Sequence, residues 1–342
     1  MSDHERATSP EEHMKIQSPL PTSTTSASMV VCASHAPLMY CHARPPAEHE
    51  QVEATFAELQ EQIDAFDPEL VFVFGPDHYT SLFRRLAPPF TIAARCEAVD
   101  DIGGHPGRLD VPTDLAVECV RHLAQHGIDA AISYDFKVDH GISQTLHRIT
   151  GAIGRYPTIP VIVNTMTPPL PPFHRSRLLG TTIGEFARGL NRRVLFLGSG
   201  GLSHNPKVIF PDYGTAEAGV TSWQQQGPAS TSMSSEAWYS RLTDIHHEAA
   251  AALAAGGITA EDCRFNGEFD HKVIDILTSG TFSEMDHWDN PSIVESAGIG
   301  AVEVHTWLAA CAAQVAAGGN APVCDLYAQT LEYGIAVGLL HA

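Results

Sequence analysis

The chain has 342 residues, of which 44% are hydrophobic, and this is enough to build one large α/β domain or two modest ones. Its 40 acidic residues outnumber its 20 basic residues, and the net charge of -20 argues against nucleic acid or an anionic membrane as a partner. No apolar run is judged long enough to span a bilayer, so a membrane protein is not expected. The seven cysteines form no CxxC pair and favour a reduced, cytoplasmic compartment. Nineteen histidines in an acidic chain are a composition suited to metal chemistry.

The first 27 residues are polar and rich in Ser, Thr, Pro and Glu. They lack a cationic start followed by an apolar stretch, which predicts a disordered leader and not a signal peptide. A single folded domain is expected over residues 28–342, because no repeat of solenoid length and no clean linker interrupts it.

Short apolar runs alternate with amphipathic stretches through the first 200 residues. In residues 47–66, for example, Val52, Phe56, Leu59 and Ile63 recur at spacings of three and four, which predicts a helix. The alternation predicts an α/β fold, with a central mostly parallel or mixed sheet flanked by helices on both faces. In chain order we expect a strand at 28–33, a helix at 47–66, a strand at 70–74, a Pro-rich loop at 88–107, a helix from 112, a strand at 130–134, a helix at 142–151, a strand at 159–163, a helix at 175–191 and a strand at 193–197.

The pattern weakens after residue 204. Residues 211–235 are rich in Gly, Ser, Thr and Gln, so the segment 205–235 is predicted to be in part a flexible insertion. Two further helices are expected, over 235–255 and over 299–317. The second carries Glu303 on an otherwise apolar face, where an unpaired buried carboxylate would be costly. A metal partner would remove that cost, and an exposed helical glutamate is the alternative.

Four histidines lie just after predicted strands: His35, His78, His140 and His204. In open α/β sheets, ligands bind beyond the carboxyl ends of the strands, and parallel strands bring those ends to one edge. A single histidine in such a place is most often a hydrogen-bonded loop residue. Four in the same relation to four strands predict that at least three share one site.

Such a cluster suits metal chemistry. Two histidines and one carboxylate with open positions form the triad of non-haem Fe(II) oxygenases, and the same ligands can hold catalytic zinc. The other two histidines would then be free for proton transfer. Spacing alone does not identify which two bind the metal.

The histidine motifs, taken in order, resemble those of the class III extradiol ring-cleaving dioxygenases of the LigB-like superfamily. The likeness covers most of residues 29–317, and the four motifs in this order are specific where any one of them alone is not. The motifs are Ser34-His-Ala-Pro-Leu38, Gly75-Pro-Asp-His-Tyr79, Val138-Asp-His-Gly141 and Leu195-Phe-Leu-Gly-Ser-Gly-Gly-Leu-Ser-His204, with Asp67-Pro-Glu-Leu70, Pro88-Pro-Phe90, Thr167-Pro-Pro-Leu-Pro171 and Glu303-Val-His-Thr-Trp307.

The resemblance implies that residues 28–342 form a catalytic domain that opens the ring of a 3-substituted catechol with O2. It implies Fe(II) held by His35, His78 and Glu303, with His140 as the base and His204 as the acid. It also implies a homo-oligomer. Asp77 and Asp139, each beside a site histidine, are candidates to orient imidazoles, and exposed loop acids are the alternative.

Rival functions remain open at this point. A zinc hydrolase would use the same ligands to activate water, although no HExxH pattern is present. A non-catalytic binding relative is a third class, and loss of any one of His35, His78, Glu303 or His140 would have favoured it, but all four are present. A Ser-His hydrolase at Ser203 is set aside because Gly198-Ser-Gly-Gly lacks GxSxG spacing. If the substrate is acidic, the candidate cations are Arg44, Lys137, Arg175 and Arg177.

Overall fold

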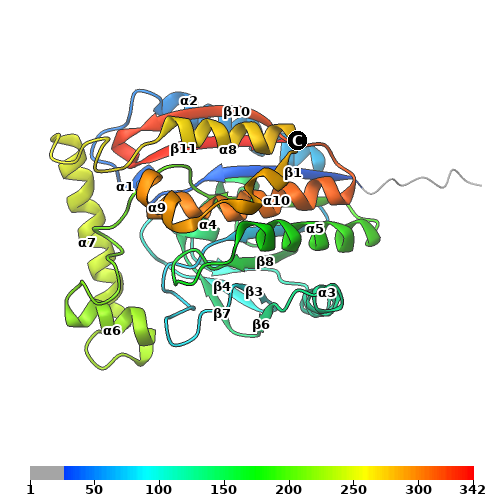
Figure 1. Cartoon of the computed structure of the whole chain (residues 1–342), viewed down its shortest axis with the longest axis horizontal. Coiled ribbons are helices and arrows are strands. Elements are labelled where there is room, and N and C mark those ends of the chain that lie inside the picture. The colour runs from blue at the N-terminus through cyan, green and yellow to red at the C-terminus, as the bar shows by residue number, and fades with distance from the viewer. Residues whose placement is uncertain (1–26) are drawn as a thin grey trace, which may run out of the picture.

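The computed structural model describes residues 27–342, and Figure 1 shows their arrangement. All of the predicted leader except Ala27 lies outside the described residues. The described chain is a mixed sheet of eight strands with helices on both faces, and a second sheet of three short strands lies beside it. The predicted fold class is therefore confirmed.

Four parallel strands form the centre of the large sheet, in the order β1, β9, β2, β8. The edges make the sheet mixed, because β11 is antiparallel to β1 and β3 is antiparallel to β8. The full order is β10-β11-β1-β9-β2-β8-β3-β6 in the large sheet and β5-β4-β7 in the small one. The strands are β1 (Ser28–Ser34), β2 (Leu70–Gly75), β3 (Phe90–Ala93), β4 (Cys96–Ala98), β5 (Gly107–Arg108), β6 (Ala131–Ser133), β7 (Phe136–Val138), β8 (Thr158–Val163), β9 (Val194–Gly200), β10 (Val323–Thr330) and β11 (Ile335–His341).

Side chains of the central strands alternate between two cores, one on each face of the sheet. On β1, Val30 and Cys32 enter one core, whereas Val31 and Ala33 enter the other. Helices α3, α5, α8 and α10 cover the first face, and α2 and α4 cover the second. The helices are α1 (Leu38–Cys41), α2 (His49–Phe66), α3 (Thr113–Gln125), α4 (His140–Thr150), α5 (Phe173–Gly189), α6 (Ala218–Gln226), α7 (Ser235–Ala254), α8 (Gly267–Ser279), α9 (Asn290–Ala297) and α10 (Val304–Ala317), with 3-10 turns at Gly227–Ala229, Phe282–His287, Ile299–Glu303 and Leu331–Tyr333.

Helices α5 and α10 lie side by side in Figure 1 because glycines remove the side chains between them. A Cβ atom on Gly180 would lie 2.0 Å from the Ala309 carbonyl oxygen, and one on Gly184 would lie 2.1 Å from that of Ala313. Glycines four residues apart therefore let the two backbones touch. This close packing holds α10 against the sheet with Glu303 at its start.

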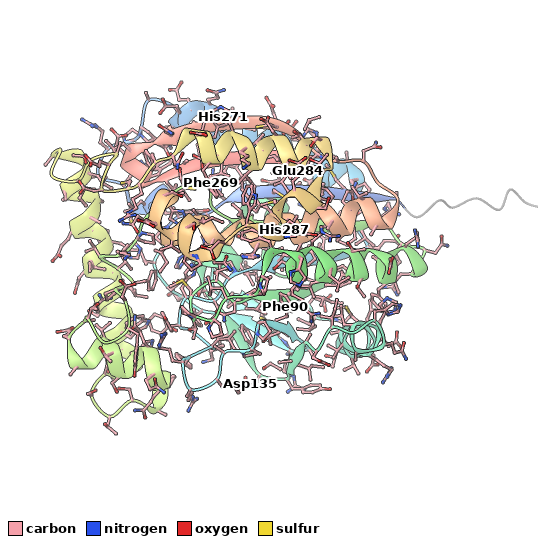
Figure 2. All side chains as sticks on the ribbon, in the orientation of Figure 1. Phe90, Asp135, Phe269, His271, Glu284 and His287 are labelled. Atoms are coloured by element: carbon pink, nitrogen blue, oxygen red, sulfur yellow. The ribbon has the colours of Figure 1, made fainter. Side chains whose placement is uncertain are left out.

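Several details differ from the sequence-based expectation. The region 88–107 is not one long loop, because β3, β4 and β5 begin within it. Phe90 of β3 is buried in the core, whereas Asp135 of the β6–β7 turn lies at the periphery (Figure 2). The helix expected over 299–317 begins as a 3-10 turn, Ile299–Glu303, before α10. Helix α6 lies within the segment predicted to be a partly flexible insertion, and it buries Trp223 against Trp238 of α7.

The expectation that no apolar stretch reaches membrane-spanning length is wrong for the part of the chain that the structure describes. The helical stretch Ile299–Ala317 is long and apolar enough by length and composition. It is nevertheless 83% buried inside the protein, where it fills the interior between α5 and the sheet. Its apolar character is that of a core helix.

Candidate metal centre and active site

Three of the four predicted site histidines extend from neighbouring parallel strands. His35 follows β1, His204 follows β9 and His78 follows β2, and these strands are adjacent in the large sheet. His140 arrives by a different route, as the first residue of α4 after β7 of the small sheet. The reasoning from parallel strands therefore holds for three histidines, and the small sheet delivers the fourth.

The structure brings these side chains together with Glu303. Donor atoms of His35, His78 and His140 all lie within 4.8 Å of one another, and all three residues are buried. The His78 and His140 rings stack, with centroids 4.6 Å apart and planes 9° from parallel. The Glu303 carboxylate lies 3.6 Å from His35 Nε2 and 3.2 Å from His78 Nε2. Metal–ligand bonds near 2 Å place donor atoms roughly 3–4 Å apart, and the two distances from Glu303 lie in this range.

Asp139 orients the imidazole of His78. One carboxylate oxygen accepts from the His78 backbone N–H at 2.8 Å, and the other lies 3.1 Å from Nδ1. A carboxylate has no proton to donate, so Nδ1 of His78 carries a hydrogen toward Asp139, and Nε2 faces the Glu303 carboxylate. Asp139 was a candidate to orient an imidazole, and in the structure the imidazole that it contacts is that of His78.

Ser199 orients the imidazole of His35 in the same sense. Its hydroxyl donates to the Gly141 carbonyl at 2.5 Å, so the oxygen is an acceptor toward His35 Nδ1, 3.1 Å away. Thr145 lies 2.7 Å from the same hydroxyl oxygen and supplies a second hydrogen. His35 Nδ1 is therefore protonated, and its Nε2 lone pair points toward Glu303. Fixing the tautomer of a histidine through its outer nitrogen is how proteins prepare a metal ligand.

Glu303 is itself incompletely satisfied. Its Oε2 atom is shielded from solvent and has no hydrogen-bond partner among the described residues. Burial raises its pKa, but the neighbouring His35 and His78 outweigh burial and lower the pKa to about 2, so the carboxylate stays ionised. Burial lowers the pKa of His35 to about 3, so its imidazole stays neutral. An orphaned carboxylate oxygen beside two imidazole Nε2 atoms fits a divalent cation.

His78 holds a proton that a cation would displace. Burial acts to lower its pKa, but Asp139 and Glu303 together raise it well above the ordinary value. A ligating imidazole must be neutral, so binding of a metal at this site would release that proton.

His140 is paired with a carboxylate that the sequence analysis did not identify. The two residues are joined by His140 Nδ1 and Asp101 Oδ2, 2.5 Å apart, and the His140 backbone N–H donates to the same oxygen at 3.2 Å. Asp101 belongs to the region expected to be a long loop, and it is not adjacent in sequence to any histidine. Only the fold of β3 to β5 brings it here.

His204 is held differently. Its Nδ1 donates to the Leu202 carbonyl at 2.9 Å, so the partner is a neutral group and not a carboxylate. Glycines surround the ring closely: a Cβ atom on Gly300 would lie 2.0 Å from His204 Nε2. The loop that carries His204 is anchored by Asp270 of α8, which accepts from the Ser203 backbone N–H at 2.8 Å and from its hydroxyl at 2.7 Å.

Asp77 does not contact an imidazole. It accepts instead from the backbone N–H groups of Thr80, Ser81 and Leu82 at 3.2, 2.9 and 3.0 Å. Its pKa is raised to about 7 by burial and by the nearby Asp139. It shapes the turn after His78, so of the two acids proposed to orient imidazoles only Asp139 does so.

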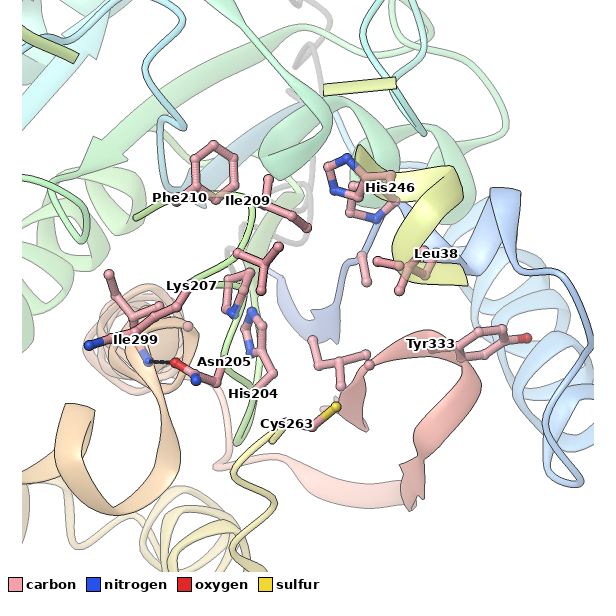
Figure 3. Close-up of a pocket in the computed structure, with 18 of the residues that line it drawn as sticks. Leu38, His204, Asn205, Lys207, Ile209, Phe210, His246, Cys263, Ile299 and Tyr333 are labelled. Carbon is pink, nitrogen blue, oxygen red and sulfur yellow. Dashed lines mark hydrogen bonds between the residues drawn. The ribbon is translucent and has the colours of Figure 1, made fainter. Parts of the chain in front are cut away.

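A cavity of about 370 Å³ opens from the cluster and includes His204 in its wall (Figure 3). The wall is otherwise largely apolar, and helix α7 supplies part of it. His246 of α7 is a lining residue that the sequence analysis missed. Burial lowers its pKa to about 3, and its Nδ1 donates to the Leu242 carbonyl at 2.7 Å, which leaves Nε2 as an acceptor.

None of the four cations named from the sequence lines this cavity. Arg44 pairs with Glu332 and Arg177 with Asp286, while Arg175 donates to the Gly127 carbonyl. Lys207 is the one Lys or Arg among the lining residues, all of which are described by the structure. It lies three residues after His204, in the same loop, and that proximity was the signal in the sequence that could have identified it.

Comparison with known proteins places this site in a family. Residues 29–333 match the family described as the catalytic LigB subunit of aromatic ring-opening dioxygenase. The chain is 38% identical over 315 residues to a 2,3-dihydroxyphenylpropionate/2,3-dihydroxicinnamic acid 1,2-dioxygenase of Azotobacter vinelandii, covering 91% of this chain and 97% of that protein. It is 40% identical over 287 residues to the protein of the same name from Mycolicibacterium gilvum, covering 84% and 89% of the two chains.

A solved structure of an uncharacterized protein from Escherichia coli K12 aligns with 92% of this chain and 98% of its own, at a TM-score of 0.44 and 14% identity, too distant to bear on function. The family match and the curated relatives extend over the cluster of four histidines and Glu303. The family predicted from the histidine motifs is confirmed. The chain belongs to the LigB family of catalytic subunits of aromatic ring-opening dioxygenases, whose chemistry employs a metal cofactor.

Proposed function

We propose that this chain is an Fe(II)-dependent extradiol dioxygenase that opens the ring of a 3-substituted catechol with O2, in the catabolism of aromatic compounds. The observation that carries the proposal is the buried Oε2 of Glu303, which has no hydrogen-bond partner among the described residues although the Nε2 atoms of two imidazoles face its carboxylate. His35, His78 and Glu303 would hold the ion. When bound, Fe(II) supplies a Lewis acid for the catechol oxygens and a path for electrons from the ring to O2.

His140 has the structure of a general base. Its Nδ1–H is held by the Asp101 carboxylate, which stabilises the imidazolium that forms when Nε2 accepts a proton. A catechol hydroxyl is a weak acid near neutral pH, so its deprotonation needs such a partner. We assign His140 to the removal of that proton.

His204 suits the opposite role. Its Nδ1–H is held by a backbone carbonyl, a neutral partner, whereas the Nδ1–H of His140 faces a carboxylate. Because Nδ1 is already committed as a donor, His204 must be doubly protonated to act as an acid. We assign it to delivering a proton during ring cleavage.

The proposed substrate carries a side chain at ring position 3, as in 2,3-dihydroxyphenylpropionate. The curated relatives are named for that compound and its cinnamic acid counterpart, both of which bear a carboxylate. The cavity offers an apolar wall for the chain of the substituent and a single Lys side chain, that of Lys207. Lys207 Nζ lies 3.1 Å from Asp212 Oδ2, and both side chains are at least partly exposed to solvent. Such a pair is weak, so Lys207 can exchange Asp212 for a substrate carboxylate.

A zinc hydrolase is the second candidate, since the same three ligands suit zinc. The paired His140 and Asp101 favour proton removal from a bound hydroxyl, and a water held by zinc needs that help less, because zinc lowers the pKa of its water by itself. The two functions separate cleanly, because only one of them consumes oxygen.

We also propose a cytoplasmic location and a homo-oligomer. All seven cysteines are free, which suits a reducing compartment. The oligomer rests on likeness to the family, and a native mass measurement tests it.

Oxygen consumption tests the proposed function. Anaerobic protein given Fe(II) and 2,3-dihydroxyphenylpropionate should take up O2 when air is admitted and form a yellow ring-opened product. Zn(II) in place of Fe(II) should give no turnover. Turnover without oxygen, or equal activity with zinc, would contradict the proposal.

A further inference from the structure

A second group of metal-binding side chains lies on the outside of the molecule, where α3 packs against α5. His122 is in the last turn of α3, and His126 follows directly after its end. Their rings lie close together, with centroids 4.1 Å apart. Glu185 of α5 completes the group, and ligand atoms of the three residues all lie within 4.8 Å of one another.

Both histidines are prepared to offer a lone pair. His126 Nδ1 donates to the His122 carbonyl at 2.8 Å, so its Nε2 is the unprotonated nitrogen. Burial, followed by the neighbouring His126, lowers the pKa of His122, and this favours a neutral ring. An imidazole fixed through one nitrogen by a backbone carbonyl is the arrangement that proteins use for a metal-binding histidine.

His122 also carries an unsatisfied atom. Its Nε2 is shielded from solvent and has no hydrogen bond to any described residue. The Thr182 carbonyl acts on this ring, but it does not reach Nε2 with normal hydrogen-bond geometry. Nε2 is therefore left without a partner among the described residues and is available to a ligand.

We propose that His122, His126 and Glu185 form a second metal site, distinct from the catalytic centre, for a divalent d-block cation such as Zn²⁺. Histidines four residues apart on a helix face the same side, and Glu185 approaches from the neighbouring helix. Bonds of 2.0–2.1 Å in a tetrahedral site place ligand atoms roughly 3.3 Å apart, so a small closure of side chains at the surface suffices. Water would complete the coordination.

The ion would connect α3 and α5 on their outer sides, whereas their inner sides pack in the hydrophobic core. Helix α3 packs against the β3–β6 edge of the large sheet, and α5 lies against α10. A bond from each helix to one ion would tie that edge to the centre of the domain. The site is therefore expected to stabilise the fold without entering the ring-opening chemistry.

Zn²⁺ binding to the full chain tests this inference. Equilibrium dialysis of wild type should give one more equivalent of Zn²⁺ than His126→Ala or Glu185→Gln, and these variants should bind that ion at least about tenfold more weakly. His247→Ala, which removes an exposed histidine of α7, is the matched control and should bind as wild type does. His35→Ala should lose a different equivalent, that of the catalytic centre.

Thermal melting gives a second readout. Zn²⁺ should raise the melting temperature of His35→Ala but raise it less when His126→Ala is added. Without metal, His126→Ala should melt as wild type does, because His126 is exposed. The proposal would be overturned if His126→Ala and Glu185→Gln both bound as much Zn²⁺ as wild type. It would also be overturned if wild type bound a single equivalent of Zn²⁺ and His35→Ala bound none.

Discussion

Asp101 accepts from His140 twice through one carboxylate oxygen, from Nδ1 at 2.5 Å and from the backbone N–H at 3.2 Å. The double contact fixes both the ring and the start of α4 that carries it. The other oxygen, Oδ1, is buried and has no partner among the described residues. Both hydrogen bonds of the Asp101 carboxylate are thus with His140, and its negative charge lies next to the protonated Nδ1 of the ring.

Removing that charge should slow the reaction without removing the metal. Asp101→Asn is expected to lower kcat by about 10- to 100-fold, because an amide stabilises the imidazolium of His140 less than a carboxylate does. Bound iron, measured by colorimetric assay, should be unchanged. Asp100→Asn alters the exposed neighbour and should retain wild-type kcat. Loss of iron in Asp101→Asn would mean that Asp101 supports the metal centre instead.

Metal content should divide the site residues into two groups. His35→Ala and Glu303→Ala each remove a ligand and should lose iron, whereas His140→Ala and His204→Ala should retain iron and lose rate. The physical reason is that Glu303 lies beside the Nε2 atoms of His35 and His78, whereas the ring of His140 is held by Asp101 and that of His204 by a backbone carbonyl. Iron per chain after gel filtration is the measurement, and kcat is measured on the same samples. If the second pair also strips the metal, the assignment of roles is wrong.

Gly300 should be intolerant of a methyl group because of His204. A Cβ atom there would lie within 2.4 Å of three ring atoms of His204, so the imidazole must move. Gly300→Ala is expected to lower kcat by about 100-fold, comparable to loss of a positioned proton donor, with iron retained. Gly189→Ala, at the end of α5, has open space around its Cβ and serves as the control. Wild-type kcat in Gly300→Ala would show that His204 need not stay where it is.

Lys207 should discriminate between charged and uncharged ring substituents. Lys207→Met is expected to lower kcat/KM for 2,3-dihydroxyphenylpropionate by about tenfold, which corresponds to roughly 1.4 kcal/mol of transition-state binding. The kcat/KM for 3-propylcatechol should not change. The two compounds differ in the carboxylate that Lys207 would pair with. Lys137→Met, at an exposed lysine outside the cavity, is the control. An equal loss on both compounds would assign Lys207 a structural role.

His246 should make the fold sensitive to acid. Its pKa is lowered to about 3 in the folded protein, so between the ordinary value of 6.5 and about 3 the unfolded chain binds a proton that the folded one does not. Stability contributed by the neutral ring is complete above pH 6.5 and declines as the pH falls through that window. The decline attributable to His246 is about 2–3 kcal/mol at pH 4.5.

Urea unfolding at pH 7 and pH 4.5 measures this loss. His246→Leu should reduce the difference in unfolding free energy between the two pH values, whereas His247→Leu, at the exposed neighbour, should not. An unchanged difference in His246→Leu would assign the acid sensitivity to other buried groups, such as His305, whose pKa is also lowered to about 3 by burial.

The sequence by itself determined the fold class, the family and the cluster of side chains. Apolar runs of strand length alternate with amphipathic helices, and that alternation allows few architectures besides a sheet covered on both faces. Histidines placed just after strands converge because β1, β9 and β2 are parallel neighbours, and this consequence of topology can be read from the chain. The residues of this kind are His35, His78 and His204.

The tertiary structure decided which groups support the cluster, because their contacts span long distances in sequence. Asp101 reaches His140 only through the short strands β3 to β5, which carry too few residues to show a clear period. Asp139 acts on His78, 61 residues away, and not on the histidine beside it. Helix α7 adds His246 to the cavity by packing against α1 and the Leu331–Tyr333 turn, contacts that no local pattern records. Local periodicity specifies elements, whereas the partners of a buried polar group depend on how those elements pack.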